Sequence, residues 1–162
     1  MNTKKLISYV VLLMMLVIFP FLSWLYLKNG YEYRKQNLQE LSGNYPLFIP
    51  ETLDTGLVHI LGKTSLVIPS VDTFFTTNLY KQFKDAPTFQ LISDYKAGEF
   101  QGQPNWILLP DSVFSAFVKL NDIQVAALID TAAKIRRKYS VDEKDYIKSV
   151  VEHTATLLPF TK

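Results

Sequence analysis

One run of 22 residues without a charged side chain, residues 6–27 (LISYVVLLMMLVIFPFLSWLYL), constrains this chain more than any other feature. A helix of that length spans roughly 33 Å, against about 30 Å of bilayer hydrocarbon. Trp24 and Tyr26 lie at its end, where aromatic rings favour the membrane interface. The run therefore predicts a transmembrane helix, with a kink at Pro20 that a membrane helix tolerates.

A cleaved signal peptide is the competing interpretation of this run. Its apolar region is usually about 7–15 residues long and is followed by a small-x-small cleavage site. The residues that follow here, SWLYLKNGYEYR, offer no such site. We therefore expect an uncleaved anchor surrounded by membrane lipid.

Charges beside the run bear on its orientation. Two lysines within residues 1–5 favour a cytoplasmic N-terminus, whereas Lys28, Arg34 and Lys35 favour the opposite weakly. We expect a single-pass protein of the inner (cytoplasmic) membrane, with its C-terminal domain outside the cytoplasm, in the periplasm.

The composition excludes several classes of function. A net charge of +2, without an arginine-rich patch interleaved with aromatic residues, argues against a nucleic-acid partner. The chain contains no cysteine, which excludes disulfides, thiol catalysis and thiolate metal sites. The absence of cysteine does not identify the compartment, since proteins outside the cytoplasm also lack it at times.

The remainder of the chain divides into a stalk and one domain. Residues 28–43 suit a juxtamembrane helix or stalk, because YEYRKQNLQEL is followed by the helix-stopping residues Gly43 and Pro46. Residues 44–162 are enough for a single domain with one core. Short apolar runs predict strands at 57–61, 65–68, 88–93, 106–109 and 125–130. Residues 134–140, KIRRKYS, alternate Ile135, Arg137 and Tyr139 with charged neighbours, which predicts an antiparallel strand near an edge of the sheet.

Helices are expected between these strands and at the end of the chain. The first begins at Asp72 or Thr73, and the second at Pro110. Ser140 and Glu143 form the S-x-x-E pattern of a capping box, which predicts the start of the last helix. The apolar face expected for that helix, which Pro159 ends, comprises Ile147, Val150, Val151, Thr154, Leu157 and Leu158.

The order of these elements indicates an α/β fold. A strand–helix–strand run is followed by a hairpin through residues 131–133 and by a closing helix. That is the order of a thioredoxin-like domain, in which a central mixed sheet has helices on both faces.

The C-terminal sequence VAALIDTAAKIRRKYSVDEKDYIKSVVEHTATLLP resembles the same part of the SCO/SenC proteins. These are membrane-anchored, thioredoxin-like copper chaperones for cytochrome c oxidase. Upstream, GYEYRKQNLQEL, ILGKTSLVI and LYKQFKDAPTFQLIS fall in the matching order, so the resemblance covers most of the chain. No single motif is diagnostic, and the resemblance lies in order and spacing.

The chain departs from this family at the metal site. The family carries Cys-x-x-x-Cys just after the strand that here reads SLVIPSV, and soft sulfur ligands favour Cu(I). Residues 69–78 contain no cysteine. The family's histidine lies eight residues before the aspartate that ends its strand, a position occupied here by Asp122. The resemblance therefore implies a retained fold without copper or thiol chemistry, and we expect no catalytic residue, metal, cofactor or small-molecule substrate.

Five residues form a candidate partner surface at the edge where the family's metal loop would lie. They are Asp72, Phe74, Phe75, Phe100 and Trp106. Core packing is the plainer role for most of these aromatic side chains, but a subset could form an exposed apolar patch.

Two functions remain open from the sequence. The first is a non-catalytic binding or assembly module, acting on a respiratory oxidase or another integral membrane complex. The alternative is a metal carrier or enzyme with a non-cysteine site near Asp72, drawing on Asp122, His59 or the threonines at 76 and 77. The threonines have no nearby base in the sequence, and His59 and His153 lie far apart, so ordinary structural roles are expected for all four.

Overall fold

The computed structural model describes residues 3–50, 60–69, 73–94, 102–140, 142–143 and 145–158. The chain splits into two compact units, Met1–Asn37 and Leu38–Lys162. Each unit is described by itself below.

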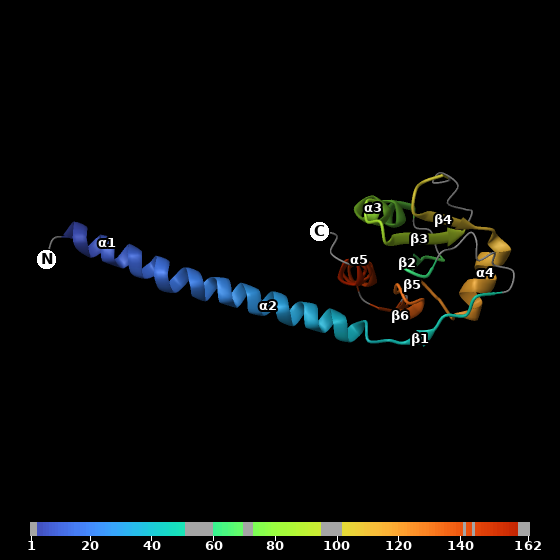
Figure 1. Ribbon diagram of the computed structural model, residues 1–162, viewed down its shortest axis with the longest axis horizontal. Helices are drawn as coiled ribbons and strands as arrows, with labels where there is room; N and C mark the ends of the chain where they lie inside the picture. Colours follow the sequence, from blue (N-terminus) through green and yellow to red (C-terminus); the bar gives the residue numbers. More distant parts are fainter. Residues whose placement is uncertain are drawn as a thin grey trace. The chain divides into compact units, whose positions relative to one another are not determined.

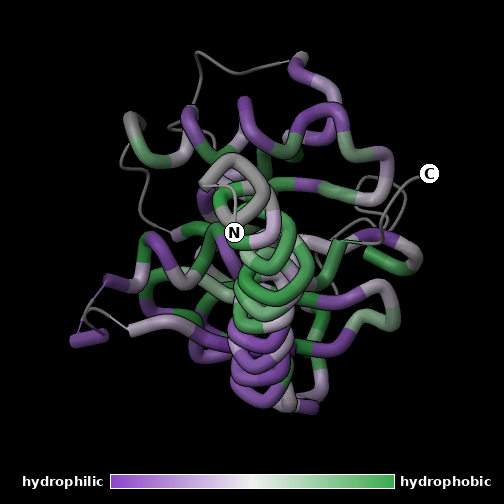
Figure 2. The backbone as a smooth tube through the Cα atoms, turned by 90° about the vertical axis from the view of Figure 1, so that its left-hand side faces the viewer, coloured by the Kyte–Doolittle hydropathy of each residue, from purple (hydrophilic) through white to green (hydrophobic). Residues whose placement is uncertain are grey.

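The first unit is helical. Helix α1 (Thr3–Leu13) leads through the π-helical turn η1 (Met14–Ile18) into α2 (Phe19–Glu40), whose last residues belong to the second unit. The wider turn directly precedes Pro20, which has no N–H to donate and whose ring crowds the preceding turn. Along the tube in Figure 2, hydrophobic turns give way to hydrophilic ones. By length and composition this helix could cross a membrane.

A six-stranded mixed sheet, in the order β1-β6-β5-β2-β3-β4, forms the centre of the second unit (Figure 1). Strands β2, β3 and β4 are parallel, whereas β5 is antiparallel to β2, β6 to β5, and β1 to β6. The strands are β1 (Tyr45–Pro46), β2 (Thr64–Val67), β3 (Phe89–Asp94), β4 (Trp106–Leu109), β5 (Ala126–Ile129) and β6 (Lys134–Tyr139).

Helices cover both faces of this sheet. Helices α3 (Thr73–Phe83) and α5 (Tyr146–Leu157) pack on one face, in a core that includes Phe89, Leu128 and Tyr139. Helix α4 (Asp111–Leu120) packs on the other face through Phe114 and Phe117. The α/β architecture predicted from the sequence is therefore confirmed.

The strand expected at 57–61 differs from the structure. Residues 57–59 lie outside the described residues, and Ile60 and Leu61 lead into a turn. Gly62 has a φ of +82° in that turn, a conformation that glycine adopts without steric cost. The strand of this region that pairs in the sheet is β2, which the sequence predicts within one residue.

The start of the last helix is a second correction. Helix α5 begins at Tyr146, so Ser140 does not cap it. Its N-cap is Asp145, which has a φ of +62° and makes no side-chain capping hydrogen bond. Ile147, expected on the buried face, lies in the first turn of α5 and is 43 % exposed. The last described helical residue is Leu157, and Pro159 lies outside the described residues.

Candidate functional site

The strand–helix junction between β2 and α3 is the site that the sequence singled out. Residues 70–72, including Asp72, lie outside the described residues. In the described part, 68–69 and 73–80, no side chain is charged and none is histidine or cysteine. Thr76 is fully buried and Leu79 is 1 % exposed. Most of the described side of the junction is therefore buried, whereas Asn78 is exposed.

Two of the five residues of the candidate partner surface, Phe75 and Trp106, are buried. Phe75 is 9 % exposed and Trp106 is 6 % exposed, and both belong to the core between the sheet and helices α3 and α5. The indole Nε1 of Trp106 donates a hydrogen bond to Ser93 Oγ over 2.8 Å. These two aromatic side chains are buried because α3 and β4 turn them inwards. Of the other three, Asp72 and Phe100 lie outside the described residues, and only the backbone of Phe74 is described.

The alternative metal or catalytic residues do not gather in the described part of the chain. Asp122 has a side chain that is 84 % exposed, in the turn between α4 and β5. His153 is buried in α5, and His59 lies outside the described residues. Within the described residues, no three side chains of His, Asp or Glu meet at the spacing of a metal site.

A polar network, buried at Tyr139 and His153 and partly exposed at its charged members, joins β6, α5 and the last residue of α2. Tyr139 Oη lies 2.9 Å from Nδ1 of His153, whose Nε2 lies 3.5 Å from an oxygen of Glu40. The guanidinium of Arg137 pairs with both Glu40 and Glu143, and it lies 5.5 Å from the centre of the Tyr139 ring. Three elements are thereby held together within the second unit.

Burial and neighbouring charges fix the protonation states in this network. Burial, aided by Arg137, holds the pKa of His153 below its ordinary value, whereas the nearby carboxylates act in the opposite direction. Burial also raises the pKa of Tyr139, so this phenol keeps its proton. A carboxylate only accepts, so Nε2 of the neutral imidazole carries the proton facing Glu40. Its Nδ1 then accepts a hydrogen bond from Tyr139.

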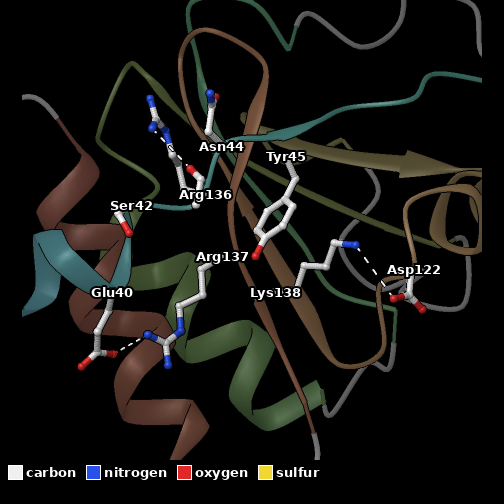
Figure 3. Close-up of a pocket in the computed structure, with 9 residues that line it drawn as sticks. Glu40, Ser42, Asn44, Tyr45, Asp122, Arg136, Arg137 and Lys138 are labelled. Atoms are coloured by element: carbon white, nitrogen blue, oxygen red, sulfur yellow. Dashed lines mark hydrogen bonds and ion pairs between the residues drawn. The ribbon is translucent and has the colours of Figure 1, made fainter.

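A cleft of about 790 Å³ lies beside this network and is called the β6 cleft here (Figure 3). Arg136, which lines it, pairs with Asp130 at 2.6 Å. Lys138 reaches towards Asp122 at 4.0 Å and lies 5.7 Å from the centre of the Tyr45 ring. The cleft is lined by Glu40, Ser42, Gly43, Asn44, Tyr45, Asp122, Arg136, Arg137 and Lys138.

Asp130 fixes the hairpin that carries these basic residues. One of its oxygens accepts hydrogen bonds from the backbone N–H groups of Ala132 and Lys134, both at 2.9 Å. Burial alone would raise the pKa of Asp130, but those hydrogen bonds and Arg136 outweigh burial and hold it below the ordinary value. Arg136 is therefore held in the hairpin by Asp130. The ion pair of Lys138 with Asp122, at 4.0 Å, is longer than that of Arg136 with Asp130, at 2.6 Å.

Sequence reasoning identified β6 as an edge-like antiparallel strand but missed the β6 cleft. The cleft depends on residues 40–45 lying against residues 136–138, more than ninety positions later in the chain. The alternation of charged residues in KIRRKY was the available signal, and it indicated an exposed strand rather than a cavity.

Comparisons with known proteins bear on the fold. No protein-family model matches the sequence. No curated protein matches it either. BsSco, a member of the Sco family of cytochrome c oxidase assembly proteins in which a disulfide switch was identified, superposes with a TM-score of 0.51 at 14 % identity, covering 73 % of this chain and 96 % of that one. The domain has a thioredoxin-like fold.

Two further structures are similar to this thioredoxin-like domain. A proposed protein disulfide isomerase from Bacteroides thetaiotaomicron has a TM-score of 0.47 at 16 % identity, covering 72 % of this chain and 89 % of that one. A thiol:disulfide interchange protein of the thioredoxin family from Chlorobium tepidum TLS has a TM-score of 0.44 at 13 % identity, covering 73 % and 97 %. At such identities the likeness concerns the fold alone.

Proposed function

We propose that this chain is a membrane-anchored, redox-inactive SCO/SenC-like protein that acts as a binding or assembly module. Its partner in this proposal is an integral membrane complex, specifically a respiratory oxidase, which it serves as an accessory factor or subunit. One observation carries the proposal: a chain without cysteine has a thioredoxin-like domain, and buried side chains, among them Phe75 and Leu79, make up most of the described side of its strand–helix junction.

The absence of thiols argues for binding rather than catalysis. In disulfide exchange the attacking group is a thiolate, and this chain has none. A Cu(I) site without cysteine needs several Met or His ligands, and the chain has three methionines and two histidines. Met14 and Met15 lie in the apolar helix, and His153 is engaged by Tyr139. These absences support the proposed role of a scaffold that offers surfaces to a partner.

The proposed location is the inner membrane, with the second unit in the periplasm. The apolar N-terminal helix and the two lysines before it support this placement. Protease added to cells with a permeabilised outer envelope and an intact inner membrane should digest the second unit. A second unit that stays protected under those conditions would contradict the orientation.

Deletion of the gene tests the proposed function. Membranes of the deletion strain should show reduced terminal oxidase activity, which the wild-type chain restores. After extraction in mild detergent, the affinity-tagged chain should co-purify with oxidase subunits. Unchanged oxidase activity together with no oxidase subunit in the purified material would overturn the proposal.

A further inference from the structure

Among the described strands, none pairs with the outer edge of β6 beyond its first two residues. Strand β1 pairs with β6 only at Ile135 and Lys134, and no other described strand adjoins that edge. Arg136 is the extra residue of a β-bulge, because the register passes from Arg137 opposite Leu128 to Ile135 opposite Ile129. Residues 137–139 therefore lie at a sheet edge, and Arg137 and Lys138 of this edge line the β6 cleft.

The backbone of Lys138 is directed towards the cleft. The carbonyl of the next residue, Tyr139, accepts the N–H of Val125 and so points towards β5. Successive strand residues direct their backbone groups to opposite edges, which turns the N–H and C=O of Lys138 outwards. At the other end of the cleft, a Cβ on Gly43 would lie 2.2 Å from the carbonyl oxygen of Arg136, so the chain already covers that residue closely.

Charge decides what can pair with this edge. Lys138 is partly exposed, and its ion pair with the largely exposed Asp122 is long, so a carboxylate from elsewhere can replace that aspartate. Antiparallel pairing with the same edge of a second copy, centred on the outward backbone groups of Lys138, would place the two Lys138 side chains opposite each other, which is unfavourable. The charge of this edge thus disfavours pairing with a second copy of the chain and favours pairing with an acidic strand.

We propose that the open edge of β6 binds an extended, acidic peptide segment of a partner protein by strand addition. The segment pairs its backbone with Lys138 and places a carboxylate on that side chain, beside the ring of Tyr45. Strand addition to a free edge is a common mode of peptide recognition. The inference rests on the proposed binding role and names the chemistry of the partner for it. With two backbone hydrogen bonds and one ion pair, the site is weak and reversible.

A fluorescent seven-residue peptide of alternating threonine and glutamate tests the inference against the full chain in detergent micelles. Fluorescence anisotropy should rise with protein concentration, and hydrogen exchange of the Lys138 amide should slow. Lys138→Glu should weaken binding about fivefold or more. Asp122→Asn should strengthen it, and asparagine tolerates the φ of +50° at that position. Lys84→Glu, at an exposed turn after α3, is the matched control and should change nothing.

N-methylation separates strand addition from simple charge attraction. A glutamate directly opposite Lys138 uses its own N–H in the pair, so methylating the glutamate amides should weaken binding about tenfold. Methylating the threonine amides, which face solvent, should leave binding unchanged. Equal binding of the two methylated peptides, an equal effect of Lys84→Glu, or no anisotropy change would overturn the inference. Oxidase activity and co-purification are separate measurements, so the proposed function stands or falls independently of this result.

Discussion

Tyr139 and His153 meet between β6 and α5 with 1 % and 2 % exposure. Tyr139→Phe removes the hydroxyl and leaves Nδ1 of His153 buried without its partner. We expect the free energy of unfolding to fall by about 1–2 kcal/mol, measured by urea titration. Tyr45→Phe is the matched control. Tyr45 is 53 % exposed, so removal of its hydroxyl should change the free energy of unfolding little. Similar effects of the two substitutions would contradict the buried pair.

His153 also makes a pH dependence testable. Burial and Arg137 lower its folded pKa below the ordinary value of about 6.5, despite the opposing charges of Glu40, Glu143 and Glu152. Between the two pKa values the unfolded chain binds more protons, so stability is full above about pH 6.5 and falls as the pH drops towards the folded pKa. Urea midpoints between pH 5 and 8 should show this slope, and His153→Gln should lose it. An unchanged slope in the variant would assign the titration to another group.

Among the elements, α5 shows that burial changes along one face of a helix, because Ile147 and Val150 are three residues apart. Val150 is fully buried whereas Ile147 is 43 % exposed. Val150→Ala should therefore lower the free energy of unfolding by roughly 1.5–3 kcal/mol, and Ile147→Ala by less than about 1 kcal/mol. Thermal unfolding of the two variants measures both losses of stability and compares them. A larger loss for Ile147→Ala would mean that the helix starts earlier and is rotated.

The strands of the sheet could be predicted from the sequence, whereas the start of α5 and the candidate surface could not. Apolar runs predict β2, β3, β4 and β5 because strands buried on both faces need continuous apolar residues. The S-x-x-E pattern at Ser140 misleads because the Glu143 side chain pairs with Arg137, a tertiary contact with β6 that local spacing does not reveal. Phe75 and Trp106 of the candidate surface are buried. An aromatic residue near a strand end gives the same sequence pattern whether its side chain is exposed or packed in the core, so the pattern could not distinguish the two. The β6 cleft is formed by contacts between distant segments of the chain, so it could not be predicted from local sequence patterns.

At the scale of the whole molecule, the boundary between the N-terminal helix and the domain follows from packing. The sequence places the domain start at residue 44, because Gly43 and Pro46 stop the preceding helix. The second compact unit begins at Leu38. It includes Glu40, which contacts Arg137 and His153, and Leu41, which is 3 % exposed in the core beside α3 and α5. The end of α2 is therefore part of the folded domain rather than a spacer.

Two fragments test this boundary. A fragment of residues 44–162 loses Leu41 and the carboxylate of Glu40, so it should be less stable than residues 38–162 by about 2–5 kcal/mol. Urea midpoints of the two fragments give the difference. Leu41→Ala in the longer fragment should reproduce most of the loss, because burial of an apolar side chain outweighs a partly exposed ion pair. Equal midpoints for the two fragments would place the boundary at residue 44 and make the end of α2 a stalk.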